Sequence, residues 1–252
     1  MKYDRILAME EYIHQKQTIS NKELCDKYEI SMQTLRRDIN TLCRKGSVRK
    51  IYGGVVNNES RTASSVASMD QRHDEHAYEK DAIGKDAASL VEENDVIFID
   101  SGTTAACMIP YLNENLHITV ITHSLFVINA LFAKKNIKAI LLGGELNYNT
   151  QSFMSDPAEI PYRYNKAFIA TVGINEQGCT NTNIQEGRIK RHAMAHSDQK
   201  ILLADRSKFL VCGYNTFAYP QDFDVIISDA DAPEWLQKSS GKYGIEIRKA
   251  GN

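Results

Sequence analysis

Three short segments at the start of the chain carry apolar residues at helical spacing, the first over residues 3–14. Ser20 stands before NKELCDKY and Glu23 follows three residues later, a capping-box pattern that predicts a two-turn helix. Ser31 then caps a third predicted helix, MQTLRRDINTLCRK, which we expect to end at Gly46. Helix, helix, turn and helix within 46 residues is typical of a small DNA-binding domain.

The segment VRKIYGGVV follows this third helix, and its pattern predicts two short strands around Gly53 and Gly54. A hairpin in this position is typical of the wing of a winged helix-turn-helix domain, which we assign to residues 1–57. Residues 58–72 are polar, rich in Ser and without periodicity, so we interpret them as a linker.

Strand and helix patterns alternate through residues 73–252, after a predicted helix over residues 75–92. Continuous apolar strands separated by helices indicate a mostly parallel sheet covered on both faces, so the fold class is α/β. The predicted helices cover residues 103–112, 124–134, 185–197 and 231–239. The predicted strands are residues 96–100, 118–122, 138–144, 166–173, 200–205, 224–229 and 244–249.

Charge separates the two predicted domains. The whole chain has a net charge of −2, but residues 1–56 hold 11 Lys and Arg against 7 Asp and Glu, a net charge of +4, and the rest carries −6. A basic module on an acidic body favours DNA binding by the first part alone. The opening residues do not resemble a signal peptide, no apolar run could span a bilayer, and the five scattered cysteines are typical of reduced thiols. We therefore expect a cytoplasmic protein without membrane contact.

The third predicted helix has two distinct faces. Leu35, Ile39 and Leu42 share one side at 100° per residue and mark the core face. On the opposite side, Gln33 is suited to pair with adenine and Arg37 with guanine in a major groove. The alternative is an ordinary solvated helix face. The candidate DNA-contacting residues of helix and wing are Ser31, Gln33, Thr34, Arg36, Arg37, Arg44, Arg49, Lys50 and Tyr52.

A candidate anion site lies in FIDSGTTAACMIPYL, where a buried strand ends at Asp100 and a helix opens at Thr103 and Thr104. Gly102 allows close backbone approach, Ser101 adds a hydroxyl, and the helix start offers free N–H groups, so the segment suits a phosphate. A merely capped helix is the alternative. In open α/β sheets ligands bind beyond the carboxyl ends of the strands, where this segment is expected.

Similar polar residues follow other strands: His123 and Ser124, the pair Gly143 and Gly144, and Lys208. Glu186 and Lys190 are four apart on a predicted helix, which indicates either an exposed ion pair or a ligand contact in which Lys190 meets an anion and Glu186 meets sugar hydroxyls. The candidate effector-binding set is Asp100, Ser101, Gly102, Thr103, Thr104, His123, Ser124, Gly143, Gly144, Glu186, Lys190 and Lys208.

The chain resembles the DeoR-type transcription regulators. In the first module the resemblance rests on Leu24, Ser31, Thr34, Leu35, Arg36, Arg37, Asp38, Leu42, Gly46, Gly53 and Gly54. In the second it rests on DSGTT, the LLGG strand, AFIATVGI, the E-x-x-x-K-R-x-A-M pattern and D-x-S-K-F. It implies a repressor of a sugar-catabolism operon, a fold similar to ribose-5-phosphate isomerase, operator DNA as partner and a phosphorylated sugar as inducer. The resemblance also implies that Asp38 orients an arginine side chain and that the protein has no cofactor. Oligomeric regulators of this design bind repeated half-sites, so we expect a homo-oligomer, a dimer or a tetramer.

Two departures from the family pattern concern the ligand. His123 stands where the family commonly has Asn, and Asp156 stands near a family Gly, so the inducer is expected to differ from the commonest ones. One rival function is a sugar-phosphate isomerase fused to a DNA-binding domain, but the strand AFIATVGI is not followed by the acids of the isomerases. A metal sensor is the other rival, because His192 and His196 have ligand spacing, as do His73 and His76, without a recognisable third ligand. We expect no catalytic residue and no metal.

Overall fold

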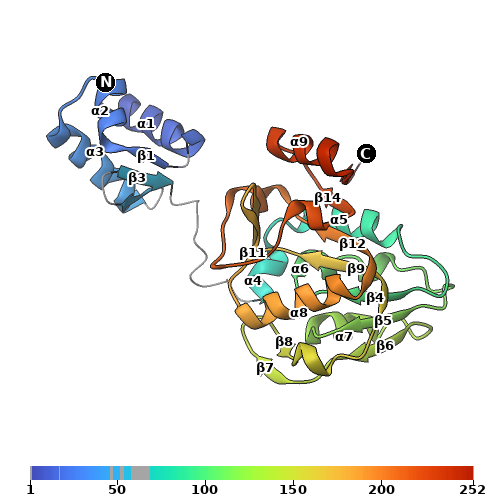
Figure 1. Cartoon of the computed structure of the whole chain (residues 1–252). Coiled ribbons are helices and arrows are strands. Elements are labelled where there is room, and N and C mark those ends of the chain that lie inside the picture. The colour runs from blue at the N-terminus through green and yellow to red at the C-terminus, as the bar shows by residue number, and fades with distance from the viewer. Residues whose placement is uncertain (1, 17, 46–47, 52–53, 58–68, 252) are drawn as a thin grey trace. The chain divides into compact units, whose positions relative to one another are not determined.

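Two units separate along the chain in the computed structural model, residues 1–61 and residues 62–252 (Figure 1). The structure describes residues 2–16, 18–45, 48–51, 54–57 and 69–251. Each unit has its own hydrophobic core and is described by itself.

The first unit is a three-helix domain with a small antiparallel sheet, as the sequence predicted. Its sheet has the order β1-β3-β2, so the strand after α1 pairs with the far strand of the wing. This β1 was not predicted, because three residues between two helices carry no periodic signal. The elements are α1 (Lys2–Lys16), β1 (Thr18–Ser20), α2 (Asn21–Tyr28), α3 (Met32–Lys45), β2 (Val48–Ile51) and β3 (Gly54–Asn57).

The core of this unit confirms the predicted inner face of α3. Leu35, Ile39 and Leu42 are buried against residues of α1, α2 and the sheet. Ser20 accepts a hydrogen bond from the Glu23 N–H at 3.1 Å, which is the expected N-cap of α2.

The second unit is built on a seven-stranded, all-parallel sheet with the order β15-β14-β12-β9-β4-β5-β6, which confirms the α/β prediction. Its strands are β4 (Val96–Ile99), β5 (Thr119–Thr122), β6 (Lys138–Leu141), β9 (Tyr164–Ala170), β12 (Ser197–Leu203), β14 (Val225–Ser228) and β15 (Glu246–Lys249). Its helices are α4 (Met69–Asp74), α5 (Ala77–Ala88), α6 (Thr103–Ala106), α7 (Leu125–Leu131), α8 (Ile184–Ala195) and α9 (Glu234–Tyr243). Single 3-10 turns form η1 (Ile109–Tyr111), η2 (Pro157–Glu159), η3 (Arg206–Leu210) and η4 (Pro220–Asp222).

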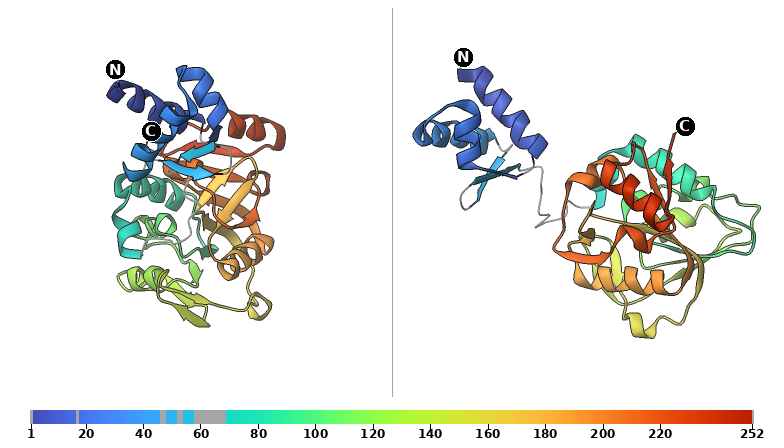
Figure 2. Two further views of the ribbon diagram at one scale, coloured as in Figure 1. Left: turned by 90° about the vertical axis from the view of Figure 1, so that its left-hand side faces the viewer. Right: turned by 45° about the horizontal axis from the view of Figure 1, so that its top comes forward.

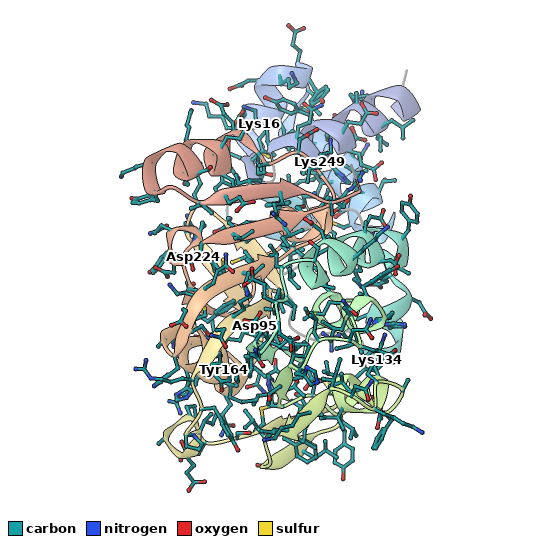
Figure 3. The ribbon with its side chains drawn as sticks, turned by 90° about the vertical axis from the view of Figure 1, so that its right-hand side faces the viewer. Lys16, Asp95, Lys134, Tyr164, Asp224 and Lys249 are labelled. Atoms are coloured by element: carbon teal, nitrogen blue, oxygen red, sulfur yellow. The ribbon has the colours of Figure 1, made fainter. Side chains whose placement is uncertain are left out.

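Helices cover both faces of this sheet (Figure 2). Alternate strand residues face opposite sides, so in β4 Ile97 and Ile99 join one hydrophobic cluster and Phe98 joins the other. The first cluster includes residues of α5, α6 and α7, and the second includes residues of α8 and α9. The carboxyl ends of the strands therefore meet between two helical layers. At the opposite edge, Asp95 precedes β4 and Tyr164 opens β9 (Figure 3).

Five short strands of the described second unit lie outside its main sheet and were not predicted. One antiparallel sheet has the order β10-β11-β13, and β7 pairs with β8 in a hairpin. The predicted strand over residues 166–173 is in fact β9 followed by β10, which belongs to the smaller sheet. These strands are β7 (Glu145–Asn147), β8 (Ser152–Met154), β10 (Gly173–Asn175), β11 (Gly178–Asn181) and β13 (Asn215–Ala218).

Two predicted helices are shorter than expected. The helix expected over residues 75–92 is α5, which covers residues 77–88 and begins after His76, whose φ is 55°. Residues 69–72, which we had assigned to the linker, belong to α4. The helix expected over residues 103–112 ends after one turn, and Pro110 stands in the 3-10 turn that follows.

Candidate functional site

The outer face of α3 carries the candidate DNA-contacting side chains. Gln33, Arg36 and Arg37 are exposed, and Thr34 is half-buried. Ser31 caps the helix, because its Oγ accepts the Thr34 N–H at 3.2 Å. These positions give the exposed polar and basic helix face that a major-groove helix requires.

Asp38 holds α3 in place from its inner side. Its Oδ2 accepts hydrogen bonds from Nε of Arg5 at 2.9 Å and pairs with Nη2 at 2.8 Å. The Asp38 side chain is 1% exposed and that of Arg5 is 28% exposed, so the carboxylate is buried while its cation reaches solvent. The family resemblance implied an arginine partner for Asp38, and that partner is Arg5 of α1.

The wing is joined to α3 by one hydrogen bond, which Lys50 of β2 donates to Oδ1 of Asn40. Of the other wing and helix candidates, Tyr52 and the side chains of Arg44 and Arg49 lie outside the described residues.

The candidate effector site centres on Asp100, which directly follows β4 and is fully buried. Lys190 of α8 reaches it across the sheet edge, donating one hydrogen bond to Asp100 Oδ2 and another to the Ala170 carbonyl at 3.0 Å. The Ala170 N–H donates to the same carboxylate oxygen at 3.1 Å. The Asp100 Oδ1 atom has no partner. Burial raises the pKa of Asp100, but the Lys190 ammonium outweighs it and keeps the pKa below its ordinary value.

Glu186 lies one turn before Lys190 on α8 and is also buried. The two do not form the exposed pair that their spacing allowed. Instead Glu186 accepts hydrogen bonds from Ser152 at 3.2 Å and from Asn181 at 3.1 Å. Ser152 of β8 and Asn181 of β11 were missed by sequence reasoning, because both stand on short strands that were not predicted.

His123 follows β5 and is fully buried, stacked on Phe98 with ring centroids 5.8 Å apart. Among the described residues, neither ring nitrogen of His123 has a hydrogen-bond partner. Burial lowers the pKa of His123 against the opposing fields of Asp100 and Glu186, so the ring is neutral at pH 7. A buried imidazole with two unpartnered nitrogens is unusual in a finished core and is typical of a ligand site.

The SGTT segment plays partly different roles from those expected. Ser101, Thr103 and Thr104 are buried at the start of α6, which has only four residues. Gly102 is required by packing, since a Cβ there would stand 2.3 Å from the Ala170 Cβ. Its small size therefore brings α6 close to β9.

Two of the other candidates, Ser124 and Lys208, have structural partners of their own. Ser124 caps α7 by accepting the Val127 N–H at 3.2 Å. Lys208 is half-buried, with its Nζ 3.7 Å from Oδ2 of Asp205. Asp205 itself caps the turn η3.

Gly143 and Gly144 are exposed and line a pocket of about 240 Å³ with Asp156 and Glu159. Gly144 has a φ of 140°, and a Cβ there would stand 2.5 Å from the Met154 carbonyl oxygen. Asp156 is exposed and caps η2 by accepting the Ala158 N–H at 3.0 Å. Two carboxylates make this pocket unsuited to an anion.

Two cations of this region were not predicted, because the sequence placed Arg72 in the linker and Lys80 inside a helix. Lys80 is 2% exposed and donates hydrogen bonds to the carbonyls of Arg72 and Glu75. Burial lowers the pKa of Arg72, while the nearby carboxylates of Glu186, Asp100 and Glu75 oppose this.

The histidine pairs do not form a metal centre. His192 and His196 stack with ring centroids 4.0 Å apart, and no group of three possible ligands occurs within the described ranges. In the same part of the chain, no helix has the length and apolar character needed to cross a membrane.

Comparison with known families and proteins assigns the chain. The profile of the DeoR C terminal sensor domain matches residues 75–230, and that of the DeoR-like helix-turn-helix domain matches residues 5–61. The chain belongs to the DeoR family. It is 40% identical over 213 residues to the HTH-type transcriptional regulator IolR of Bacillus subtilis, covering 83% of this chain and 84% of that one.

Other relatives match this chain over nearly their whole length. The lactose phosphotransferase system repressor of Staphylococcus epidermidis is 28% identical, over 94% of this chain and 96% of the repressor. The repressor GlcR of Bacillus subtilis is 30% identical, over 97% and 95%. These relatives are regulators, and this DeoR-family chain is a transcriptional regulator and not an enzyme.

Among solved structures, the ribose 5-phosphate isomerase of Methanocaldococcus jannaschii aligns with 51% of this chain and 52% of its own, at 21% identity and a TM-score of 0.37. The eIF2B beta subunit of Chaetomium thermophilum aligns with 69% and 56%, at 16% identity and a TM-score of 0.44. These likenesses are distant.

Proposed function

We propose that this regulator represses a sugar-catabolism operon and leaves its operator when a phosphorylated sugar binds at the carboxyl edge of the parallel sheet. The observation that carries the proposal is the buried polar cluster at that edge. Asp100 follows β4, His123 follows β5, and Glu186 and Lys190 lie on α8, and this buried cluster has three polar atoms without a partner among the described residues. Buried polar atoms without partners are expensive, and a ligand that bonds to them removes that cost.

The chemistry of the cluster suits a sugar that carries an anionic group. Asp100 and Glu186 offer carboxylate oxygens to hydroxyl groups, and His123 can donate to or accept from a ligand oxygen. The hydroxyls of Ser101, Thr103 and Thr104 and the cations of the region are suited to the phosphate. The name of one relative supports a sugar-derived effector, because that relative is a lactose phosphotransferase system repressor.

DNA recognition follows the winged-helix design. Gln33 and Arg37 contact base edges, while Ser31, Thr34, Arg36, Arg44, Arg49, Lys50 and Tyr52 contact phosphates or the minor groove. A homo-oligomer presents several such helices to repeated half-sites. The sugar acts as inducer only because it binds the DNA-free arrangement more tightly than the DNA-bound one.

A thermal-shift screen tests this function. The full-length protein is heated with hexose phosphates, pentose phosphates and inorganic phosphate, each sugar phosphate beside its unphosphorylated parent. A ligand that binds only the folded state raises the unfolding midpoint by mass action. We expect one phosphorylated sugar to raise the midpoint and its parent not to. The protein is first used to select binding duplexes from random-sequence DNA. The same compound should release the protein from these duplexes. A rise with a free sugar alone would refute the phosphate requirement.

A further inference from the structure

The hairpin of β7 and β8 joins two sides of the candidate site. Its strand β8 contacts both α7 and α8, and Figure 1 shows it beside these helices. On the β5 side, the Phe153 N–H donates to the carbonyl of His123 at 2.7 Å. The Leu125 N–H donates to the carbonyl of Gln151 at 2.8 Å. The backbone of this hairpin is therefore bonded directly to the segment that carries His123.

On the α8 side, the hairpin is bonded to Glu186 through side chains. Ser152 is fully buried, and its hydroxyl donates to Oε1 of Glu186 at 3.2 Å. The hydroxyl of Thr150, also buried, lies 2.7 Å from that of Ser152. Because a hydroxyl has a single proton and that of Ser152 goes to Glu186, Thr150 is the donor to Ser152. The three residues form a directed chain in which each hydrogen bond strengthens the next.

The backbone at Gln151 brings these two hydroxyls together. Residues two apart on an extended strand lie about 6–7 Å from each other with parallel side chains. Gln151 instead has a φ of 48°, in the left-handed region that a residue with a Cβ rarely adopts. The bend places the hydroxyls of Thr150 and Ser152 at bonding distance. Local backbone strain of this kind clusters at ligand sites, where the surrounding contacts hold it in place.

Glu186 is held at its other oxygen as well. Asn181 of β11 donates to Oε2 at 3.1 Å, and its own Oδ1 accepts the Thr182 N–H at 2.9 Å. Ser152 and Asn181 are neutral donors, so they fix the direction of the carboxyl group without a charge of their own. Ser152 differs from Asn181 in that its strand is also bonded to the His123 segment.

We propose that Ser152 is a positioning residue for the sugar: its hydroxyl orients Glu186 toward the hydroxyl groups of the ligand, and Thr150 supports it. Because β8 is also bonded to the His123 segment, the same strand sets the spacing between Glu186 and His123. Loss of the Ser152 hydroxyl thus weakens recognition of the sugar and leaves recognition of the phosphate unchanged. This inference rests on the proposed function and names the residues that select the sugar part of the effector.

The test compares four full-length variants in the thermal-shift assay. Ser152→Ala removes the donor to Glu186, Thr150→Val removes the hydroxyl behind it in a side chain of the same shape, and Thr150→Ser keeps that hydroxyl. Ser155→Ala is the control, because the Ser155 hydroxyl, directly after β8, donates to the carbonyl of Gly143 at 2.6 Å instead. The probes are inorganic phosphate and the hexose or pentose phosphate that raises the wild-type midpoint most. The readout is the probe concentration for a half-maximal midpoint shift.

We expect Ser152→Ala to need at least about fivefold more sugar phosphate than wild type, because a hydrogen bond that orients a ligand-binding carboxyl group is lost. Thr150→Val should show a smaller increase, while Thr150→Ser and Ser155→Ala should match wild type. The response to inorganic phosphate, which has no sugar hydroxyls, should be the same in wild type and all variants.

Three results would overturn the inference and leave the proposed function standing: wild-type affinity in Ser152→Ala, an equal loss in Ser155→Ala, or an equal loss toward inorganic phosphate. If Ser152→Ala does not fold, the pair Thr150→Val and Thr150→Ser decides, since equal affinity of the two contradicts a role for the hydroxyl chain. No response of the wild-type protein to any sugar phosphate overturns the proposed function and this inference together.

Discussion

Replacing Lys190 by Met leaves the Asp100 carboxylate buried without its cation. The two side chains are 5% and 0% exposed, so water cannot take over the lost interaction. Breaking a buried ion pair from one side costs about 3–5 kcal/mol. The Ala170 carbonyl also loses a donor, while the Ala170 N–H still supports the carboxylate. We therefore expect Lys190→Met to lower the free energy of unfolding of the second unit by about 3–5 kcal/mol at pH 7.

The loss should depend on pH in a defined direction. In the wild type the folded-state pKa of Asp100 lies below 3.8, so its stabilisation is complete above that pH. In Lys190→Met burial is no longer opposed by the lysine, so the folded-state pKa of Asp100 rises above 3.8. Asp100 then releases its proton more readily in the unfolded state than in the folded state. The stability of the variant then falls as the pH rises through this window. The difference from wild type should be smaller at pH 5 than at pH 7.

Trp235 provides the assay, because it is the only tryptophan of the chain and lies in α9 of the second unit. Its fluorescence follows urea unfolding of that unit and does not report on residues 1–61. With a slope of about 2–3 kcal/mol per M, the midpoint should move by about 1–2 M at fixed protein concentration. The double variant Asp100→Asn with Lys190→Met should lose less than the sum of its single variants. A change below about 0.5 kcal/mol in Lys190→Met, or one equal at pH 5 and pH 7, would refute the reasoning.

Three further predictions concern other residues. Arg37→Ala should weaken operator binding, relax the sequence preference and reduce by up to about 1 the slope of log binding constant against log salt concentration. Lys16→Ala on α1 serves as the control. Equal operator affinity of Arg37→Ala and wild type contradicts the assignment. Because the pKa of His123 is lowered in the folded state, the unfolded state binds a proton more readily as the pH falls. The wild type therefore loses free energy of unfolding as the pH falls below 6.5, and urea titrations should show a smaller loss in His123→Gln. Gly102→Ala should lower the thermal midpoint of the second unit, because its Cβ would stand 2.3 Å from that of Ala170; an unchanged midpoint would contradict the close packing of α6 on β9.

The sequence predicted those features of the fold that depend on local periodicity. The seven main strands are continuous apolar runs, and each appeared near its predicted position because burial on both faces demands such a run. Strands β7, β8, β10 and β11 are three or four residues long and partly polar, so they carry no comparable pattern. Their existence depends on tertiary pairing, which a single sequence does not display.

The site was predicted in its strand-end residues but not in its pairings. Asp100 and Lys190 are 90 positions apart in the sequence. Nothing in the local sequence indicates that Lys190 pairs with this distant carboxylate and not with Glu186 on its own helix. Helix α4 was missed because residues 69–72 are polar and aperiodic enough to be assigned to a linker.

The buried lysine and aspartate pairs at the two edges of the main sheet differ in how fully their polar atoms are bonded. Each edge holds a buried lysine and aspartate pair, and at the amino edge Lys166 donates to Asp95 at 2.7 Å and to Glu92 at 3.0 Å (Asp95 is labelled in Figure 3). Neither Asp95 nor Lys166 has a buried polar atom without a partner, as expected of a structural pair. At the carboxyl edge, Asp100 Oδ1 and both nitrogens of His123 have none. Each such atom costs about 1–3 kcal/mol, so a ligand that bonds to all three recovers a free energy large enough to choose between two arrangements of the protein.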